Sequence, residues 1–348
     1  MELISVIFVA RLETTTSEQK FSWSAEPVLS DDLKEPIPEI DVFVAEITDR
    51  KQTSKLVQNL NKVLPIQNLR HLKRIKGSQI LISPVSERSP SELTDLISGS
   101  GLDFSGLSLS FTKLSVASRQ PLVRSQFLVA NQKWPCNFHE NKALEKMILG
   151  EYFSPAENAA HERFMSAALD AAKSVGDGGS RVGAVIVDPA KNEIVAVGRD
   201  SRNRNPVQHA AMVAVDLVAR SQGGGAWPVN PGDYFLSPTP SEDAQSEFVH
   251  KKRKVSDDLE ASPSSGVETP KGPYLCTGYD AYLTREPCVM CSMALVHSRV
   301  RRVFYGAPSE RGALGTMTKI HLVRALNHHY EVFKGVMKED CKQLECPS

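Results

Sequence analysis

The chain has 348 residues, 41% of them hydrophobic, which is enough for two ordinary domains that each have a core. Its 41 basic and 41 acidic residues balance to zero formal charge, so overall charge favours neither nucleic acid nor an acidic partner. Six cysteines are too sparse for a disulfide scaffold, and no apolar stretch approaches the roughly 18 residues of a membrane helix. The apolar run at 3–10 lacks a preceding basic region, so a signal peptide is not expected. These features predict a protein of a reducing intracellular compartment without a membrane partner.

The first forty residues are rich in Ser, Pro and acids, and we expect an irregular segment over 1–40. Residues 41–120 then alternate between strand-like and helix-like periodicity. The predicted order is strand, helix, strand, strand, helix, strand, at 41–47, 51–64, 71–76, 79–82, 91–97 and 107–116. That order is typical of an α+β ferredoxin-like domain.

A run of basic residues lies inside this first domain, because no acid occurs from Arg50 to Ser86. Such a local excess in a neutral protein can follow a phosphate backbone, but it can equally be a solvated surface. No aromatic motif of the RNA-recognition type accompanies it. Charge alone therefore leaves both interpretations open for Lys51, Lys55, Lys62, Arg70, Lys73, Arg74 and Lys76.

We interpret residues 121–155 as a connector and residues 156–335 as a second domain. Ser154 followed by Pro155 marks a helix start, and the helix is expected to end near Gly176. The remaining predicted elements are strands at 182–188 and 193–198, a helix at 209–220, a strand at 281–284, a helix at 288–297, a strand at 302–305, a helix at 320–327 and a strand at 330–333. Residues 336–348 are expected to form a tail.

The stretch 223–272 interrupts the second domain. It is dominated by Gly, Pro, Ser, Asp and Glu, and we expect a disordered insertion. It contains Lys251-Lys252-Arg253-Lys254-Val255, which resembles a nuclear-import signal, although a plain solvated charge run is as good an explanation.

The residues that carry chemistry are His209, Cys288 and Cys291. Pro287-Cys288-Val289-Met290-Cys291 places two thiols three residues apart at a helix start, on one face and near the positive end of the helix dipole. Both effects favour the thiolates that bind Zn²⁺, and His209 begins another helix. A CxxC alone also fits a redox pair or half a zinc ribbon, but no second CxxC exists to complete a ribbon. One His and two Cys would leave a fourth zinc position open, as in sites built for a reactive water.

The two halves of this pattern resemble the zinc site of the tRNA adenosine deaminases related to bacterial TadA, in the cytidine/deoxycytidylate deaminase superfamily. One half is the segment from Glu286-Pro287-Cys288 to Tyr305-Gly306, and the other is His209-Ala210-Ala211. The resemblance covers about residues 156–335. It implies a mixed five-stranded sheet with helices on both faces, and a zinc ion held by His209, Cys288 and Cys291.

The departure from the family pattern is Ala211, which occupies the position of the glutamate in H-x-E. That glutamate moves protons between the attacking water and the departing amine, and alanine has no proton to move. The sequence therefore resembles the non-catalytic subunits of eukaryotic heterodimeric deaminases that convert adenosine 34 of tRNA to inosine. This resemblance implies a catalytic partner subunit and tRNA binding through residues 41–120. We also expect a nuclear and cytoplasmic location.

Two alternatives remain beside that interpretation. The chain could be an autonomous deaminase with an acid from elsewhere, or an RNA-binding zinc scaffold without a deaminase partner. The fourth zinc position could also be filled by the tail, whose Cys341 or Cys346 would then be a ligand.

Overall fold

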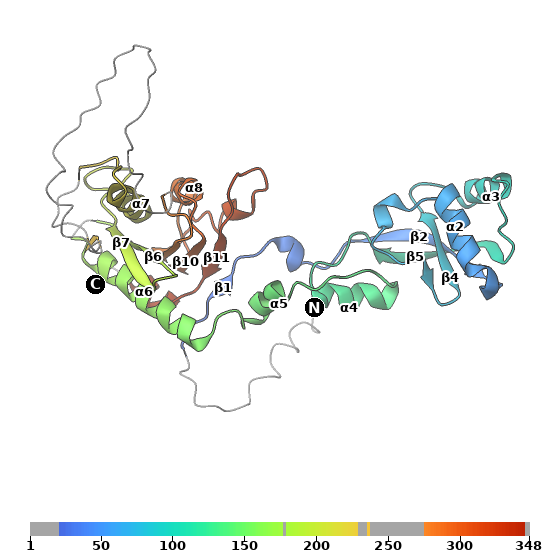
Figure 1. Ribbon diagram of the computed structural model, residues 1–348, viewed down its shortest axis with the longest axis horizontal. Helices are drawn as coiled ribbons and strands as arrows, with labels where there is room; N and C mark the ends of the chain where they lie inside the picture. Colours follow the sequence, from blue (N-terminus) through green and yellow to red (C-terminus); the bar gives the residue numbers. More distant parts are fainter. Residues whose placement is uncertain (1–20, 177–178, 229–234, 237–274, 345–348) are drawn as a thin grey trace, which may run out of the picture. The chain divides into compact units, whose positions relative to one another are not determined.

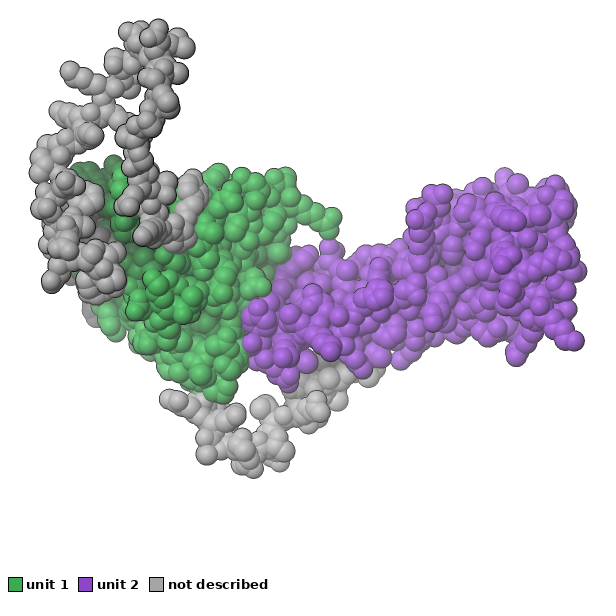
Figure 2. Space-filling model, in the orientation of Figure 1, with its two compact units in different colours: residues 1–28, 153–348 green, residues 29–152 purple. Residues whose placement is uncertain are grey.

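The computed structural model describes residues 21–176, 179–228, 235–236 and 275–344. These residues divide into two compact units (Figure 2). Residues 29–152 form the N-terminal unit, and residues up to 28 together with those from 153 onward form the C-terminal unit. No described helix is both long and apolar enough to cross a bilayer.

The N-terminal unit contains a four-stranded antiparallel sheet in the order β3-β4-β2-β5. Its elements follow the predicted order: β2 (Glu39–Ile47), α2 (Thr53–Val63), β3 (Ile75–Lys76), β4 (Gln79–Pro84), α3 (Pro90–Gly99) and β5 (Leu107–Ala117). Both the sequence of elements and the strand order are those of a ferredoxin-like fold, so that prediction is confirmed.

Strand β2 has a hydrophobic core on each face. Phe43 and Ala45 pack with apolar residues of α2 and α3, whereas Val42 and Val44 face a second core that contains Trp134. Helix α4 (Arg124–Lys133) covers this second face, and the fully buried Trp134 donates its indole N–H to the Lys73 carbonyl at 2.6 Å. The segment 121–136 is therefore part of the domain, and the prediction of a connector from 121 was wrong. Helix α5 (Lys142–Leu149) follows.

The C-terminal unit is built on a mixed sheet in the order β1-β11-β10-β9-β6-β7-β8. Strand β10 is parallel to β9 and to β11, and the other pairs are antiparallel. The five strands of the centre match the prediction: β6 (Gly183–Asp188), β7 (Glu193–Arg199), β9 (Asp280–Arg285), β10 (Arg302–Ala307) and β11 (Glu331–Lys334).

Helices cover both faces of this sheet (Figure 1). Helix α6 (Pro155–Lys173) packs its Phe164 against Tyr282, while α7 (Ala210–Ser221) and α8 (Val289–His297) share a core with Leu283 on the other face. Two glycines let the helices approach closely: a Cβ on Gly183 would collide with the Ala168 backbone, and one on Gly198 with the Ala210 backbone. Helix α7, which follows His209, is therefore seated directly on the sheet.

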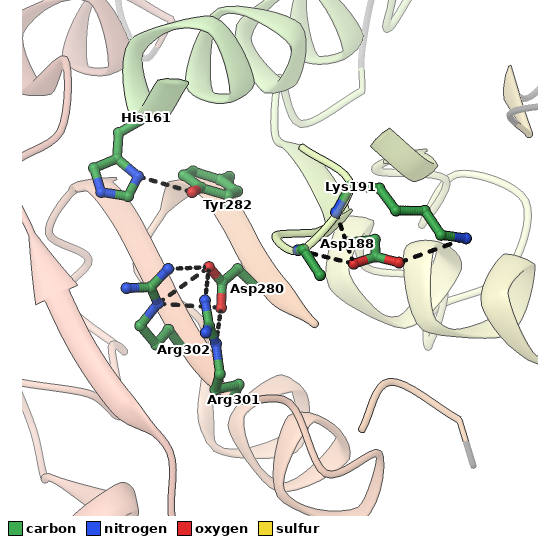
Figure 3. Close-up of polar contacts among 8 residues, drawn as sticks. His161, Asp188, Lys191, Asp280, Tyr282, Arg301 and Arg302 are labelled. Carbon is green, nitrogen blue, oxygen red and sulfur yellow. Dashed lines mark hydrogen bonds and ion pairs between the residues drawn. The ribbon is translucent and has the colours of Figure 1, made fainter. Parts of the chain in front are cut away.

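Two adjacent arginines clamp the start of strands β9 and β10 (Figure 3). Asp280 is fully buried and binds Arg301 at 2.9 Å and Arg302 at 2.6 Å. Because Arg302 and Asp280 are also register partners in the parallel pair, the carboxylate fixes the alignment of β9 with β10. Strand β9 leads straight into the Pro287-Cys288 segment, so this alignment also positions the CxxC.

The structure corrects three further predictions. Glu26–Pro27 form strand β1 on the edge of the C-terminal sheet, inside the segment 1–40 that was expected to be irregular. The helix expected at 320–327 is a single 3-10 turn, η5 (Ile320–Leu322). The expected tail 336–348 contains helix α9 (Lys338–Gln343), which packs on β10.

Most of the insertion expected at 223–272 lies outside the described residues, including the basic run 251–255. Within it, Phe235–Leu236 form the short strand β8, which pairs with β7.

Candidate metal centre

The three predicted ligands meet at the N-termini of two helices. His209 is the residue before α7, Cys288 is the residue before α8, and Cys291 lies in the first turn of α8. Their ligand atoms all lie within 4.8 Å of one another, and Cys288 Sγ is 3.8 Å from His209 Nδ1. Both helix dipoles direct partial positive charge toward this point, which stabilises thiolates.

The two cysteines differ in their affinity for a proton. The pKa of the Cys288 thiol is lowered to about 5, mainly because it accepts a hydrogen bond from Cys291, with further help from backbone N–H groups and the nearby His209. The pKa of Cys291 is raised, because it donates that bond and because its side chain is buried. A divalent cation that took the place of the proton between the two sulfurs would bind both of them as thiolates.

This donor set fits zinc. One imidazole nitrogen and two thiolates are the preferred ligands of Zn²⁺, and hard cations such as Mg²⁺ or Ca²⁺ prefer oxygen ligands. Among the described residues, these three side chains are the cluster of His, Cys, Asp and Glu that could hold a metal ion. The prediction of His209, Cys288 and Cys291 as a group is thus matched by their geometry.

The structure does not bring Cys341 into this group. Cys341 is buried in α9 against Gly306 of β10, and burial raises the pKa of its thiol to about 12. Its sulfur is not one of the ligand atoms that lie within 4.8 Å of one another at the site. Cys346 lies outside the described residues.

A cavity of about 560 Å³ opens beside the three ligands. Its wall includes His209, Ala211, Cys288 and Cys291, together with Arg285 and the 308–311 segment. Ala211 is the second residue of α7, and its methyl group borders the cavity. The volume is that of an ordinary small-molecule site. A proton-carrying side chain at position 211 would therefore reach into this cavity, and alanine does not.

Three acids line the cavity, and two of them, Glu286 and Asp200, are engaged in bonds of their own. The Glu286 carboxylate is buried and accepts backbone N–H groups from Ser309, Leu314 and Thr316 at 3.0–3.2 Å. Asp200 is paired with Arg202 at 2.8 Å. Glu310 is exposed on the 308–316 loop. Glu286 is therefore a structural anchor of that loop.

Sequence reasoning did not identify this loop as part of the site. Gly312 and Gly315 approach the Glu286 carboxylate so closely that a Cβ on Gly312 would collide with it. The pair of glycines three residues apart could have indicated a close approach in this loop. The residue that they approach, Glu286, lies more than twenty residues earlier in the chain. The pocket wall formed by Ser309, Glu310 and Arg311 depends on this long-range contact.

The seven basic residues of the N-terminal unit have different environments. Arg74 is buried, and its guanidinium donates to the carbonyls of Leu64 and Ile82; burial lowers its pKa to about 10. Lys55 is paired with Asp103, and Lys76 donates to the carbonyls at the end of α4. The prediction that Arg74 could contact RNA was wrong, because a buried guanidinium that supports the fold is not available. The side chains of the other four residues are exposed: Lys51, Lys62, Arg70 and Lys73.

A second cavity, of about 770 Å³, is lined in part by the N-terminal half of α6. Its cations Arg301 and Arg302 already bind Asp280, and Glu157 and Asp188 also line it, so the charges nearly balance. The cavity shows no cluster of metal ligands, within the described residues.

Comparison with known proteins covers both units. A family model of the cytidine and deoxycytidylate deaminase zinc-binding region matches residues 158–307. A model of the tRNA-specific adenosine deaminase TAD3 N-terminal domain matches residues 40–134, and a model of MafB19-like deaminases matches residues 276–345. The TAD3 model ends at Trp134, which belongs to the second core of the N-terminal unit.

Relatives match over nearly the whole chain. A Mus musculus protein named "Probable inactive tRNA-specific adenosine deaminase-like protein 3" is 39% identical over 342 residues, covering 94% of this chain and 93% of the mouse protein. The Homo sapiens protein of the same name is 40% identical over 335 residues, covering 93% and 92%. The Arabidopsis thaliana "tRNA-specific adenosine deaminase TAD3" is 27% identical over 386 residues, covering 90% and 95%.

Proposed function

The chain belongs to the TAD3 family of tRNA-specific adenosine deaminase subunits, and from that premise we propose that it is the non-catalytic, zinc-binding subunit of a heterodimeric tRNA adenosine deaminase. Its partner would be the catalytic subunit, which converts adenosine 34 to inosine at the wobble position. The observation that carries this proposal is Ala211, which borders the cavity beside a complete set of metal ligands.

The loss of activity follows from proton transfer. A general acid–base group typically contributes 10²- to 10⁴-fold to a rate, and deamination needs such a group to take a proton from water and to deliver one to the departing amine. Ala211 has none, and the carboxylate of Glu286 is bound by three backbone N–H groups. Asp200 is held by Arg202. These engagements argue against Glu286 and Asp200 as substitutes for the missing glutamate in an autonomous deaminase.

The metal would be held by His209 Nδ1 and the sulfurs of Cys288 and Cys291. Bound there, zinc would supply a Lewis acid and a cross-link between the first turns of α7 and α8. Without a proton shuttle, the cross-link is sufficient reason to keep the ligands, because metal affinity adds directly to folding free energy. The three residues thus retain the shape of a deaminase domain for a partner to recognise.

The N-terminal unit would contribute to tRNA binding. Lys51, Lys62, Arg70 and Lys73 are exposed, and they come from a stretch of 37 residues, 50–86, in which no acid offsets them. Neutralising phosphates with such side chains gives affinity that does not depend on sequence. These exposed cations support the proposal that the N-terminal unit binds the body of the tRNA while the partner acts on the anticodon. We further propose a nuclear and cytoplasmic location, which rests on the Lys251–Lys254 run and the place where tRNA is made and used.

The test is reconstitution. The chain is purified alone, purified with a catalytic H-x-E deaminase from the same source, and each sample is assayed for inosine at position 34 of tRNA. We expect no inosine from the chain alone and full activity from the pair, in a one-to-one complex. Inosine formed by the chain alone would overturn the assignment as a non-catalytic subunit. A native complex without any H-x-E deaminase would favour the RNA-binding scaffold instead.

A further inference from the structure

The N-terminal unit is not appended to the C-terminal unit; it is inserted into it. The chain contributes β1 to the C-terminal sheet, then forms the unit 29–152, and rejoins the C-terminal unit at Phe153 (Figure 2). Both ends of the inserted unit are therefore covalently continuous with one folded body. A family model that begins at residue 40 does not include β1.

The entry point is fixed at Val28. Its side chain is buried in the C-terminal core, and its N–H donates to the Val332 carbonyl of β11 at 2.8 Å. Its own carbonyl accepts a hydrogen bond from His321 Nε2, also at 2.8 Å. Just before it, Glu26 and Lys334 are register partners whose side chains form an ion pair of 3.4 Å.

The exit point is fixed at Phe153, which packs against the residue of β11 that follows Val332. The Phe153 ring packs edge-on against Phe333 of β11 with centroids 4.8 Å apart, and against His161 of α6 at 4.5 Å. The Arg302 guanidinium lies 5.6 Å from the same ring. Val332 and Phe333 thus receive the two ends of the inserted unit on consecutive residues of β11.

We infer that Val28 and Phe153 are positioning residues, which hold the RNA-gripping unit on two tethers instead of one. A unit held at both ends samples fewer arrangements than a unit held at one end, since each attachment removes chain entropy. When two parts of a protein must contact one ligand together, this restriction raises the effective concentration of the second contact. The shared ligand would be tRNA, so the expected change in KM for tRNA rests on the proposed function.

The first experiment severs one tether after folding. A specific protease site is inserted between Leu29 and Ser30, the chain is purified with its catalytic partner, and the complex is then cut. We expect peptide 1–29 to remain bound, because β1 and Val28 are part of the C-terminal fold, and we expect KM for tRNA to rise on the order of tenfold with kcat unchanged. The same site between Ser264 and Ser265 is the matched control, which cuts the chain once and severs neither tether.

Point variants test the two anchors without a cut. Phe153→Ala removes the ring that packs on Phe333, and Phe153→Leu retains an apolar side chain and should recover most of the affinity. Val28→Pro removes the N–H that binds Val332. Each disruptive variant should raise KM for tRNA while zinc content and partner binding stay normal, and Glu151→Ala, an exposed side chain two residues before Phe153, should behave as the parent chain.

Loss of peptide 1–29 on cutting, or an unchanged KM in the cut complex, would overturn the inference. Inactivity of the uncut complex would overturn the proposed function instead, and the retention of peptide 1–29, read by mass spectrometry, would still test the entry anchor.

Discussion

Glu286 accepts the backbone N–H of Leu314 at 3.0 Å, and this bond ties the residue two before Cys288 to the loop that carries Ser309, Glu310 and Arg311 of the cavity wall. Ser309 and Thr316 donate to the same carboxylate, so it is the hub of the 308–316 loop. A carboxylate that accepts three backbone N–H groups is held in place as an anchor of this loop.

Glu286→Gln should therefore destabilise the 308–316 loop without changing catalysis by the heterodimer. The amide presents an NH₂ group to backbone donors, and we expect a loss of about 2 kcal/mol in the free energy of unfolding. The pH profile of the heterodimer's kcat should keep its shape. Glu310→Gln, on the exposed part of the same loop, is the control and should change neither quantity. A shifted pH profile in Glu286→Gln alone would make Glu286 a participant in proton transfer.

Removing one zinc ligand should release the metal and loosen the C-terminal unit. For Cys288→Ala and Cys291→Ala we expect less than one tenth of the parent zinc content by elemental analysis. We also expect a lower unfolding temperature, because α7 and α8 lose their cross-link. Cys341→Ala is the informative control, since its sulfur lies in α9 against β10. Loss of zinc from the Cys341 variant would restore that residue as a ligand.

The metal ligands could be predicted because their signals are local. Cys288 and Cys291 are three residues apart, and His209 begins a helix with its own start signal, so each ligand is recognisable within a few residues. The alternation of Val42, Phe43, Val44 and Ala45 likewise identifies β2 without tertiary information. The ferredoxin-like order and the central five strands followed from such patterns.

The elements that escaped prediction are stabilised by distant partners. Strand β1 has two residues and no periodicity, and it exists because Glu26 and Pro27 pair with β11, about 300 residues later. Arg74 was grouped with the candidate RNA-binding cations because its burial against Leu64 and Ile82 cannot be read from the sequence. Tertiary contacts of this kind override local composition.

The exposed cations of the N-terminal unit give a salt-dependent prediction. Replacing Lys62, Arg70 and Lys73 together by Ala should weaken tRNA binding and reduce the slope of log K against log salt by about 0.7–0.9 for each phosphate contact removed. Lys113→Ala, an exposed cation of the same unit on β5, is the charge control. An unchanged slope in the triple variant, measured by filter binding over a salt series, would put the RNA surface elsewhere.

Arg74→Ala belongs to a different experiment. The loss of a guanidinium that binds the carbonyls of Leu64 and Ile82 should unfold or destabilise the N-terminal unit, and weak RNA binding by that variant would carry no information about contacts.

His161 predicts how stability responds to acid. Its Nδ1 is 2.8 Å from the Tyr282 hydroxyl, and burial lowers the pKa of the imidazole to about 4, with the nearby Arg302 adding to the effect. In the unfolded chain the same group has a pKa of about 6.5. Below pH 6.5 the unfolded state therefore binds a proton that the folded state does not bind, and stability falls as the pH falls. The loss is complete only below pH 4, where both states are protonated, and it amounts to about 3 kcal/mol.

The double variant His161→Phe/Tyr282→Phe isolates this contribution, because it removes the imidazole and leaves no hydroxyl without a partner. Acid also titrates the zinc ligands, but that effect is common to the parent and the variant and cancels in their difference. Urea unfolding of both proteins between pH 7 and pH 4 should show that the free energy of unfolding of the parent falls by about 3 kcal/mol more than that of the variant. Parallel curves across this range would mean that the imidazole is protonated in the folded protein, and that the aromatic layer around Phe153 and Phe304 accommodates its charge.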